Sequence, residues 1–159
     1  MPALSETSGF LGGQPEGSVV IRNVNRGDIR KVELRRYILG TNPKSYVSFD
    51  TWEVSCHAIT GYGTYNPAQG VRSFHLPFTR EVEVEVTSEA DPTRLYIIVD
   101  TNPVTSHVFP ASVADGAFDN LQDMLIGYYL VRFSDGGTEY RDSVKILVPV
   151  FPGTARIGA

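Results

Sequence analysis

Apolar and polar residues alternate in short runs along the chain, most regularly over residues 81–86, which read Glu-Val-Glu-Val-Glu-Val. A period of two places the valines on one face of a β-strand and the glutamates on the other. Similar runs, or runs dense in β-branched residues, predict eight strands, over residues 18–24, 29–39, 46–59, 71–78, 81–87, 94–100, 124–133 and 138–150.

Turn-forming residues separate these runs, and Gly, Pro, Asn and Asp are concentrated in residues 25–28, 40–43, 61–70, 90–92 and 135–137. The strands follow one another without helical crossovers, so we expect antiparallel pairing. Only residues 112–122 resemble a helix, and that helix would be short.

Eight strands in a chain of 159 residues favour two packed sheets, because a single open sheet would leave one face without a core. We therefore predict an all-β, eight-stranded antiparallel two-sheet sandwich with jelly-roll topology and one short helix. An immunoglobulin-type sandwich is the competing arrangement. Its Cys…Trp…Cys pattern is absent, because Trp52 and the only cysteine, Cys56, lie on the same run.

Residues 1–17 are mostly small and polar, and such a segment buries too little apolar surface to offset the entropy lost on ordering. We expect a flexible N-terminal arm over 1–17, followed by a single sandwich domain over 18–159. Phe10 and Leu11 are the candidate anchors by which the arm would order on a neighbouring subunit. A plain disordered tail is the alternative.

The charge balance disfavours direct nucleic-acid binding, since 14 Lys and Arg stand against 18 Asp and Glu, for a formal charge of −4. The single cysteine rules out an intramolecular disulfide. No uninterrupted apolar run has the length of a membrane span, and the first residues lack the pattern of a signal peptide. We expect neither membrane insertion nor secretion.

Two surfaces stand out in the predicted strands. Lys31, Glu33 and Arg35 share one face of strand 29–39, where they would pair with the glutamates of residues 81–85 or form a solvated charged face. The closing hairpin, over 124–133 and 138–150, is apolar on both faces. It is either a central strand pair of the domain or a pair with one face against another subunit.

The sequence contains no residue pattern typical of a catalytic site. Cys56 and His57 are neighbours on a strand, so their side chains point to opposite faces, and Cys56 fits a buried structural thiol. His57, His75 and His107 show no metal-ligand spacing, which makes a cupin-type metal enzyme the least favoured alternative. We predict no enzyme activity, no catalytic or metal site and no cofactor.

An aromatic segment is the best candidate for binding. Tyr62 and Tyr65 lie among the glycines of 61–70, and Trp52 lies upstream. Aromatic side chains of this kind stack on sugar rings or contact protein partners. We treat Trp52, Tyr62 and Tyr65 as a candidate interface or ligand loop, which leaves open a lectin-like, carbohydrate-binding module.

Three segments carry a resemblance to a known family: 72–78 (Arg-Ser-Phe-His-Leu-Pro-Phe), the valine-glutamate run 81–86, and 95–100 (Leu-Tyr-Ile-Ile-Val-Asp). Together they resemble the strand–turn–strand core of the bacterial jelly-roll proteins related to double jelly-roll viral capsid proteins. This chain has the length of only one roll, so it looks like a single jelly-roll capsid-type protein of a virus or phage.

The resemblance implies a non-enzymatic structural subunit, either a capsid or a capsid-decorating protein, that self-assembles. It would be made in the host cytoplasm and reside in the virion, with copies of itself and other virion proteins as partners.

Overall fold

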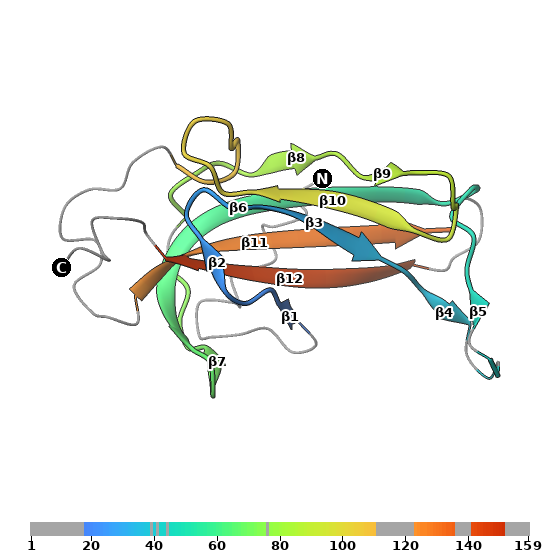
Figure 1. The fold of residues 1–159 in the computed structure, drawn as a ribbon, viewed down its shortest axis with the longest axis horizontal. Coiled ribbons are helices and arrows are strands. Elements are labelled where there is room, and N and C mark those ends of the chain that lie inside the picture. The colour runs from blue at the N-terminus through green and yellow to red at the C-terminus, as the bar shows by residue number, and fades with distance from the viewer. Residues whose placement is uncertain are drawn as a thin grey trace.

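The computed structural model describes residues 18–38, 40, 42–43, 45–75, 77–110, 123–135 and 141–151. These residues form twelve strand segments and no helix, and the strands lie in sheets that pack as a sandwich (Figure 1). The all-β class predicted from the sequence is therefore confirmed. The helix expected at 112–122 lies outside the described residues, as does the arm over 1–17.

The larger sheet is built on three long antiparallel strands. In spatial order it contains β1 (Val19–Val20), β12 (Arg141–Phe151), β11 (Asp123–Ser134), β6 (Glu53–Asn66) and β7 (Gly70–Val71). Two short strands join it at the sides: β2 (Val24–Asn25) pairs parallel with β12, and β8 (Val82–Val84) pairs antiparallel with β6. The register between β11 and β6 continues from Asp123 to Ser134 without a bulge.

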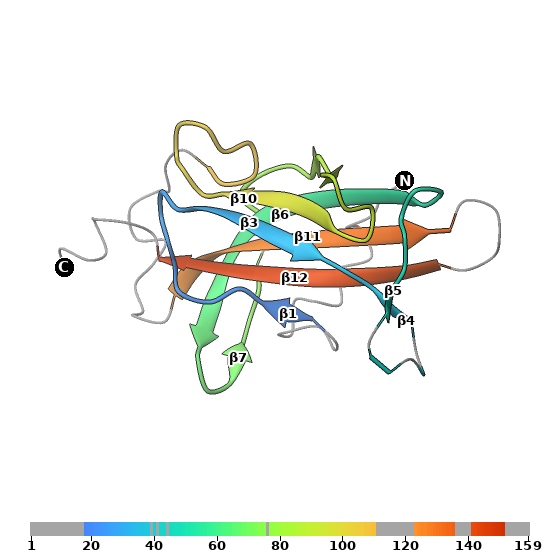
Figure 2. The ribbon, with the colours of Figure 1, turned by 45° about the vertical axis from the view of Figure 1, so that its right-hand side comes forward.

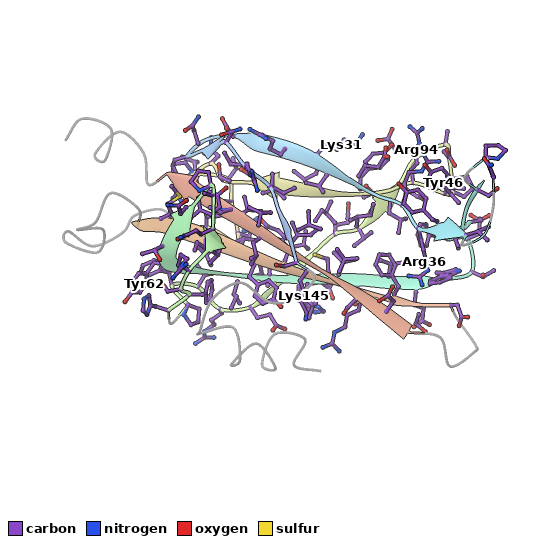
Figure 3. All side chains as sticks on the ribbon, turned by 90° about the horizontal axis from the view of Figure 1, so that it is seen from below. Lys31, Arg36, Tyr46, Tyr62, Arg94 and Lys145 are labelled. Atoms are coloured by element: carbon purple, nitrogen blue, oxygen red, sulfur yellow. The ribbon has the colours of Figure 1, made fainter. Side chains whose placement is uncertain are left out.

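The smaller sheet has the order β3 (Ile29–Leu34), β10 (Leu95–Asp100), β9 (Thr87–Ser88). β4 (Tyr37–Ile38) and β5 (Ser45–Tyr46) form a separate two-stranded pair that projects from one end of the sandwich (Figure 2). We call this pair the aromatic arm. Seen from below, β3 and β10 form one layer, and β6, β11 and β12 form the other (Figure 3).

The strand count and the jelly-roll topology expected from the sequence are not confirmed. Instead, β3, β10 and β9 face a sheet ordered β12, β11, β6, β8. A variable-type immunoglobulin sandwich has strands B, E and D in one sheet and G, F, C and C′ in the other. The observed order matches it when β3, β10 and β9 are compared with B, E and D, and β12, β11, β6 and β8 with G, F, C and C′. The chain reaches this order without an intersheet disulfide, because Cys56 is its only cysteine and is free.

An inner core fills the space between the two sheets. β3 and β10 contribute Leu34, Leu95, Ile97 and Val99, whose alternate neighbours point outward. The larger sheet contributes side chains from β6, β11 and β12, among them Cys56, Tyr129, Val131, Phe133 and Val148. Burial of each large apolar side chain contributes about 1.5–3 kcal/mol, so packing alone can hold the sheets together.

An outer core covers the opposite face of the larger sheet. It consists of Ile59, Tyr65, Val71, Phe74, Met124, Ile126, Tyr128, Leu130 and Leu147. Because β11 and β12 supply residues to both cores, the closing hairpin is buried on both faces and lies at the centre of its sheet. This confirms the internal interpretation of its two apolar faces.

The loop predicted over 61–70 is wrong in its first half, because β6 continues as a strand to Asn66. Gly61 and Gly63 mark a close approach of two backbones, not a turn. A Cβ atom at Gly63 would lie 1.8 Å from the carbonyl oxygen of Ser73, and one at Gly61 would lie 2.8 Å from that of His75. Glycine is required where the returning chain crosses this closely.

Other expected strands are interrupted. Run 29–39 divides into β3 and β4, because the chain leaves the smaller sheet at Arg35 and Arg36 to enter the aromatic arm. Run 71–78 is regular only in β7, although His75 still donates a backbone hydrogen bond of 2.7 Å to Tyr62. Strand 94–100 matches β10 to within one residue.

We predict that Cys56→Ser lowers the free energy of unfolding by about 1–3 kcal/mol, because a hydroxyl replaces the thiol in an apolar site. The Cys56 side chain is completely buried in the inner core, and burial raises its thiol pKa to about 12. Cys56→Ala is the matched control and should cost less than the serine. Urea unfolding measures both. Rapid alkylation of the native thiol at neutral pH would contradict the buried assignment.

Candidate functional site

The outward face of the smaller sheet carries a connected group of polar and aromatic side chains. Along β3, Ile29, Lys31 and Glu33 are exposed, while Leu34 is buried. On β10, Ile98 is exposed beside Lys31, its cross-strand neighbour. The period-two alternation of both strands thus presents one row of side chains to solvent and the other to the inner core. We call this surface the outer face.

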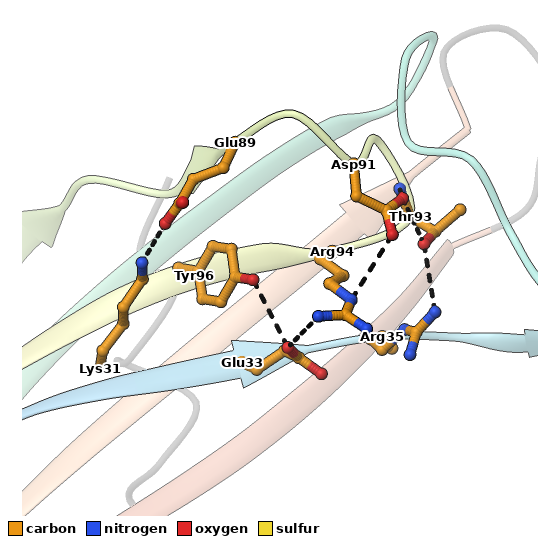
Figure 4. Close-up of polar contacts among 8 residues, drawn as sticks. All are labelled: Lys31, Glu33, Arg35, Glu89, Asp91, Thr93, Arg94 and Tyr96. Carbon is orange, nitrogen blue, oxygen red and sulfur yellow. Dashed lines mark hydrogen bonds and ion pairs between the residues drawn. The ribbon is translucent and has the colours of Figure 1, made fainter.

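Ion pairs connect the strands of the outer face (Figure 4). Lys31 donates a hydrogen bond to Glu89, which raises the pKa of the lysine, and its ammonium lies 4.2 Å from the centre of the Tyr96 ring. Glu33 lies 3.7 Å from Arg94 and accepts a hydrogen bond from the Tyr96 hydroxyl. Opposite charges therefore neutralise one another across the sheet.

The network continues into the turn before β10. Arg94 lies 3.5 Å from Asp91, whose pKa is lowered mainly by hydrogen bonds from Thr93. The Thr93 hydroxyl also accepts a hydrogen bond from Arg35 at 3.3 Å. On this face Lys31, Arg35 and Arg94 are thus matched by the carboxylates of Glu89, Glu33 and Asp91, so these groups leave no excess positive charge to attract an anion.

The aromatic arm joins the outer face at one end. The rings of Tyr37 and Tyr46 lie 5.1 Å apart, and the Arg35 guanidinium lies 3.4 Å above the Tyr46 ring. Tyr37 and Ile38 remain exposed at 51% and 44%. Exposed tyrosine and isoleucine on a projecting strand pair, next to an arginine, have the composition of a protein-contact surface.

The structure does not bring Trp52, Tyr62 and Tyr65 together. Trp52 lies just before β6, against Phe49 and under Arg36, whereas Tyr62 is ten residues further along the strand. At about 3.3 Å per residue that separation is roughly 33 Å. Figure 3 shows Arg36 and Tyr62 at opposite ends of the molecule. Tyr65 is buried in the outer core, so the expected loop of three exposed aromatics does not form.

Tyr62 instead belongs to a group of three rings that we call the ring stack. His75 lies 4.7 Å from Tyr62, and Phe78 lies 5.3 Å from it, measured between ring centres. His75 and Phe78 are exposed, the latter at 38%. The sequence pattern did not predict this group. His75 and Phe78 reach Tyr62 because the irregular segment after β7 runs back alongside β6.

The three histidines lie in different surroundings. His57 on β6 lies 3.9 Å from Glu83 on β8, His75 is in the ring stack, and His107 is exposed in the loop after β10. Within the described ranges no group of three His, Cys, Asp or Glu side chains could hold a metal ion. Glu83 lies in the larger sheet, so the expected pairing of residues 81–85 with Lys31 is wrong; Glu89 takes that position.

The candidate anchors Phe10 and Leu11 lie outside the described residues. No helix in the described part of the chain is long and apolar enough to cross a membrane. Neither a protein-family model nor a curated protein sequence matches this chain.

We predict that Tyr65→Ala lowers the free energy of unfolding by about 3–5 kcal/mol, since it leaves a cavity in the outer core. Tyr62→Ala should cost about 1 kcal/mol, because it removes a partly exposed ring and its ring contacts. Urea unfolding of the two variants measures the difference. Equal losses would contradict the assignment of Tyr65 to a core and Tyr62 to the surface.

Proposed function

We propose that this chain is a non-enzymatic structural subunit of a virus or phage particle, a capsid or capsid-decorating protein that self-assembles. The observation that carries the proposal is the aromatic arm, which projects from the sandwich with Tyr37 and Ile38 exposed beside Arg35. Surfaces rich in tyrosine and arginine with apolar neighbours are typical of protein interfaces.

The burial of the reactive groups supports a structural role over a catalytic one. Cys56 is inaccessible, and the Tyr129 hydroxyl is buried, which raises its pKa. A nucleophile requires access to substrate and a means of deprotonation near neutral pH, and neither group has them.

Charge supports protein partners over nucleic acid. The formal charge is −4, and the described cations of the outer face neighbour carboxylates or hydroxyls. Binding to phosphates requires lysines and arginines free to replace condensed counterions. The proposed partners are copies of the chain and other virion proteins, with synthesis in the host cytoplasm and residence in the virion.

The finer architecture of the sandwich also belongs to this proposal. The sequence favoured a jelly roll, the fold of the capsid proteins it resembles. The observed pairing order supports an immunoglobulin-type sandwich more directly, because β11 and β12 form a hairpin within one sheet and β3 pairs with β10 in the other. A decorating subunit is the form of the proposal that this order favours, since such a domain presents separate edges and loops for contacts.

A carbohydrate-binding module is the second candidate, and the ring stack is the observation that favours it. Exposed rings offer flat apolar faces on which sugar rings stack. Tyr62, His75 and Phe78 provide such faces at the end of the molecule opposite the aromatic arm. A cupin-type enzyme is less supported, because His57, His75 and His107 have different neighbours.

We predict that the double variant Tyr37→Ala, Ile38→Ala forms smaller assemblies while its thermal midpoint falls by only a few degrees, since the side chains are half exposed. Light scattering and electron microscopy measure assembly, and calorimetry measures the midpoint. Val104→Ala, at an apolar residue 88% exposed elsewhere on the surface, is the matched control. Assemblies equal to those of the control would argue against the arm as a contact.

Tyr62→Ala separates the two candidate functions. Under the first candidate, it leaves assembly unchanged and the wild type gives no signal on a glycan array. A wild-type monomer that binds a glycan, and loses that binding in Tyr62→Ala, would support the second candidate instead.

We predict that removing residues 1–17 preserves the thermal transition but reduces assembly, because the segment lacks core-forming content yet contains Phe10 and Leu11. The double variant Phe10→Ala, Leu11→Ala in the full chain should reproduce the loss if these residues are the anchors. Loss of the thermal transition would place the segment in the fold, and normal assembly would show that it makes no contact.

A further inference from the structure

Strand β3 lies at an edge of the smaller sheet, where among the described strands it pairs with β10 alone. Just before β3, Thr101 donates a backbone hydrogen bond of 3.0 Å to Asp28. Hydrogen-bonded pairs alternate along an antiparallel ladder, so Arg30, Val32 and Leu34 bond to β10. The backbone N–H and C=O groups of Lys31 and Glu33 consequently point toward the open edge.

An open strand edge is a template for another strand, and its side chains decide which strand can pair with it. On β3, Lys31 and Glu33 have opposite charge, are two residues apart and lie on the same face. Such a strand is complementary to itself when reversed, because a lysine then meets a glutamate at both ends of the pair.

We propose that two copies of this chain pair β3 with β3 in antiparallel orientation, about a two-fold axis that passes between the two Val32 residues. The two smaller sheets then form one continuous sheet, with both outer faces on the same side. This inference rests on the proposed function, because it identifies one contact of the self-assembling subunit and names its partner as a second copy of the chain.

The register follows from charge and from the direction of the backbone groups. With Val32 opposite Val32, Lys31 lies opposite Glu33 of the second copy, and these are residues whose N–H and C=O groups face the partner. A shift of two residues would place Lys31 opposite Lys31 or Glu33 opposite Glu33, which is unfavourable. A shift of one residue would turn the outer face of one copy toward the inner core of the other.

The end of β3 limits the length of the proposed pair. Ile29, 59% exposed at the start of β3, lies at the outer end of the pair, opposite the point where the second copy leaves its sheet after Leu34. The pair is therefore confined to residues 30–34, where Lys31 meets Glu33 of the other copy on both sides of the two-fold axis.

The test is a charge exchange in the full chain. Lys31→Glu places glutamates opposite each other, and Glu33→Lys places lysines opposite each other. By symmetry each substitution acts twice, so each should raise the dimer dissociation constant about ten-fold or more, measured by analytical ultracentrifugation. Glu33→Gln, which removes the charge without reversing it, should give an intermediate value. The double variant Lys31→Glu, Glu33→Lys should restore the dimer.

Rescue by the double variant would separate the contact between copies from the ion pairs within one copy. Lys31 pairs with Glu89 and Glu33 with Arg94, and neither partner changes, so both internal pairs remain disrupted in the double variant. The thermal midpoint, which reports the internal pairs, should not recover, whereas the dissociation constant should.

Three further outcomes would distinguish failure of the β3–β3 contact from failure of the proposed function. If the wild type assembles and the single charge variants assemble equally well, the inference is wrong while the proposed function stands. If the dimer responds to the charges as expected but no larger assembly forms, the inference stands and the proposed function loses its support. If removing residues 1–17 creates a dimer absent from the full chain, this segment occupies the edge of β3 and the inference is wrong for the intact protein.

Discussion

Burial of both faces of β11 is the constraint on which the rest of the structure depends. One row of its side chains, including Tyr129, Val131 and Phe133, lies in the inner core, and the other row, including Ile126 and Tyr128, lies in the outer core. β11 also lies inside its sheet, because β12 and β6 pair with its two edges. The remaining strands are then left for the edges and the second layer, where contacts with other molecules are possible.

The sequence predicted the strands well where an apolar run is dense and less well elsewhere. The β10 and β11 segments were predicted to within one residue at each end, because each is dense in aliphatic and aromatic residues. The regularly alternating run 81–87 forms a strand of the larger sheet over Val82–Val84 only. The glycines of residues 61–70 predict a turn, but Gly61 and Gly63 lie within β6. The two glycines have no side chain, which allows the backbone of residues 73–75 to pass close to β6. This contact joins segments that are distant along the chain, so no local sequence pattern predicts it.

The candidate site was harder to predict, because it depends on which strands are neighbours. Trp52 and Tyr62 are close in sequence, but a fourteen-residue strand places them at opposite ends of the molecule. The charges of Lys31 and Glu33 were identified, yet their partners were not. Glu89 follows β9 and Arg94 precedes β10 of the smaller sheet, whereas Glu83 lies on β8 beside β6 in the larger sheet. Alternation alone does not assign a strand to a sheet.

The charged side chains of Lys31 and Glu33, at the edge of the smaller sheet, bear on both the stability of the domain and its proposed association. Unprotected edge strands aggregate, and lysine or glutamate on the strand discourages this by keeping the edge hydrated. Charges of a single sign would repel every copy, whereas the sequence Lys31-Val32-Glu33 repels a copy in the wrong register and attracts one in the matching register. Lys31 and Glu33 already pair internally with Glu89 and Arg94, so the proposed β3–β3 contact would rearrange existing ion pairs and expose no new charge. A contact of this kind is expected to be weak and reversible, as the proposed role in a self-assembling particle requires, because subunits that join weakly can leave and rejoin in the correct register.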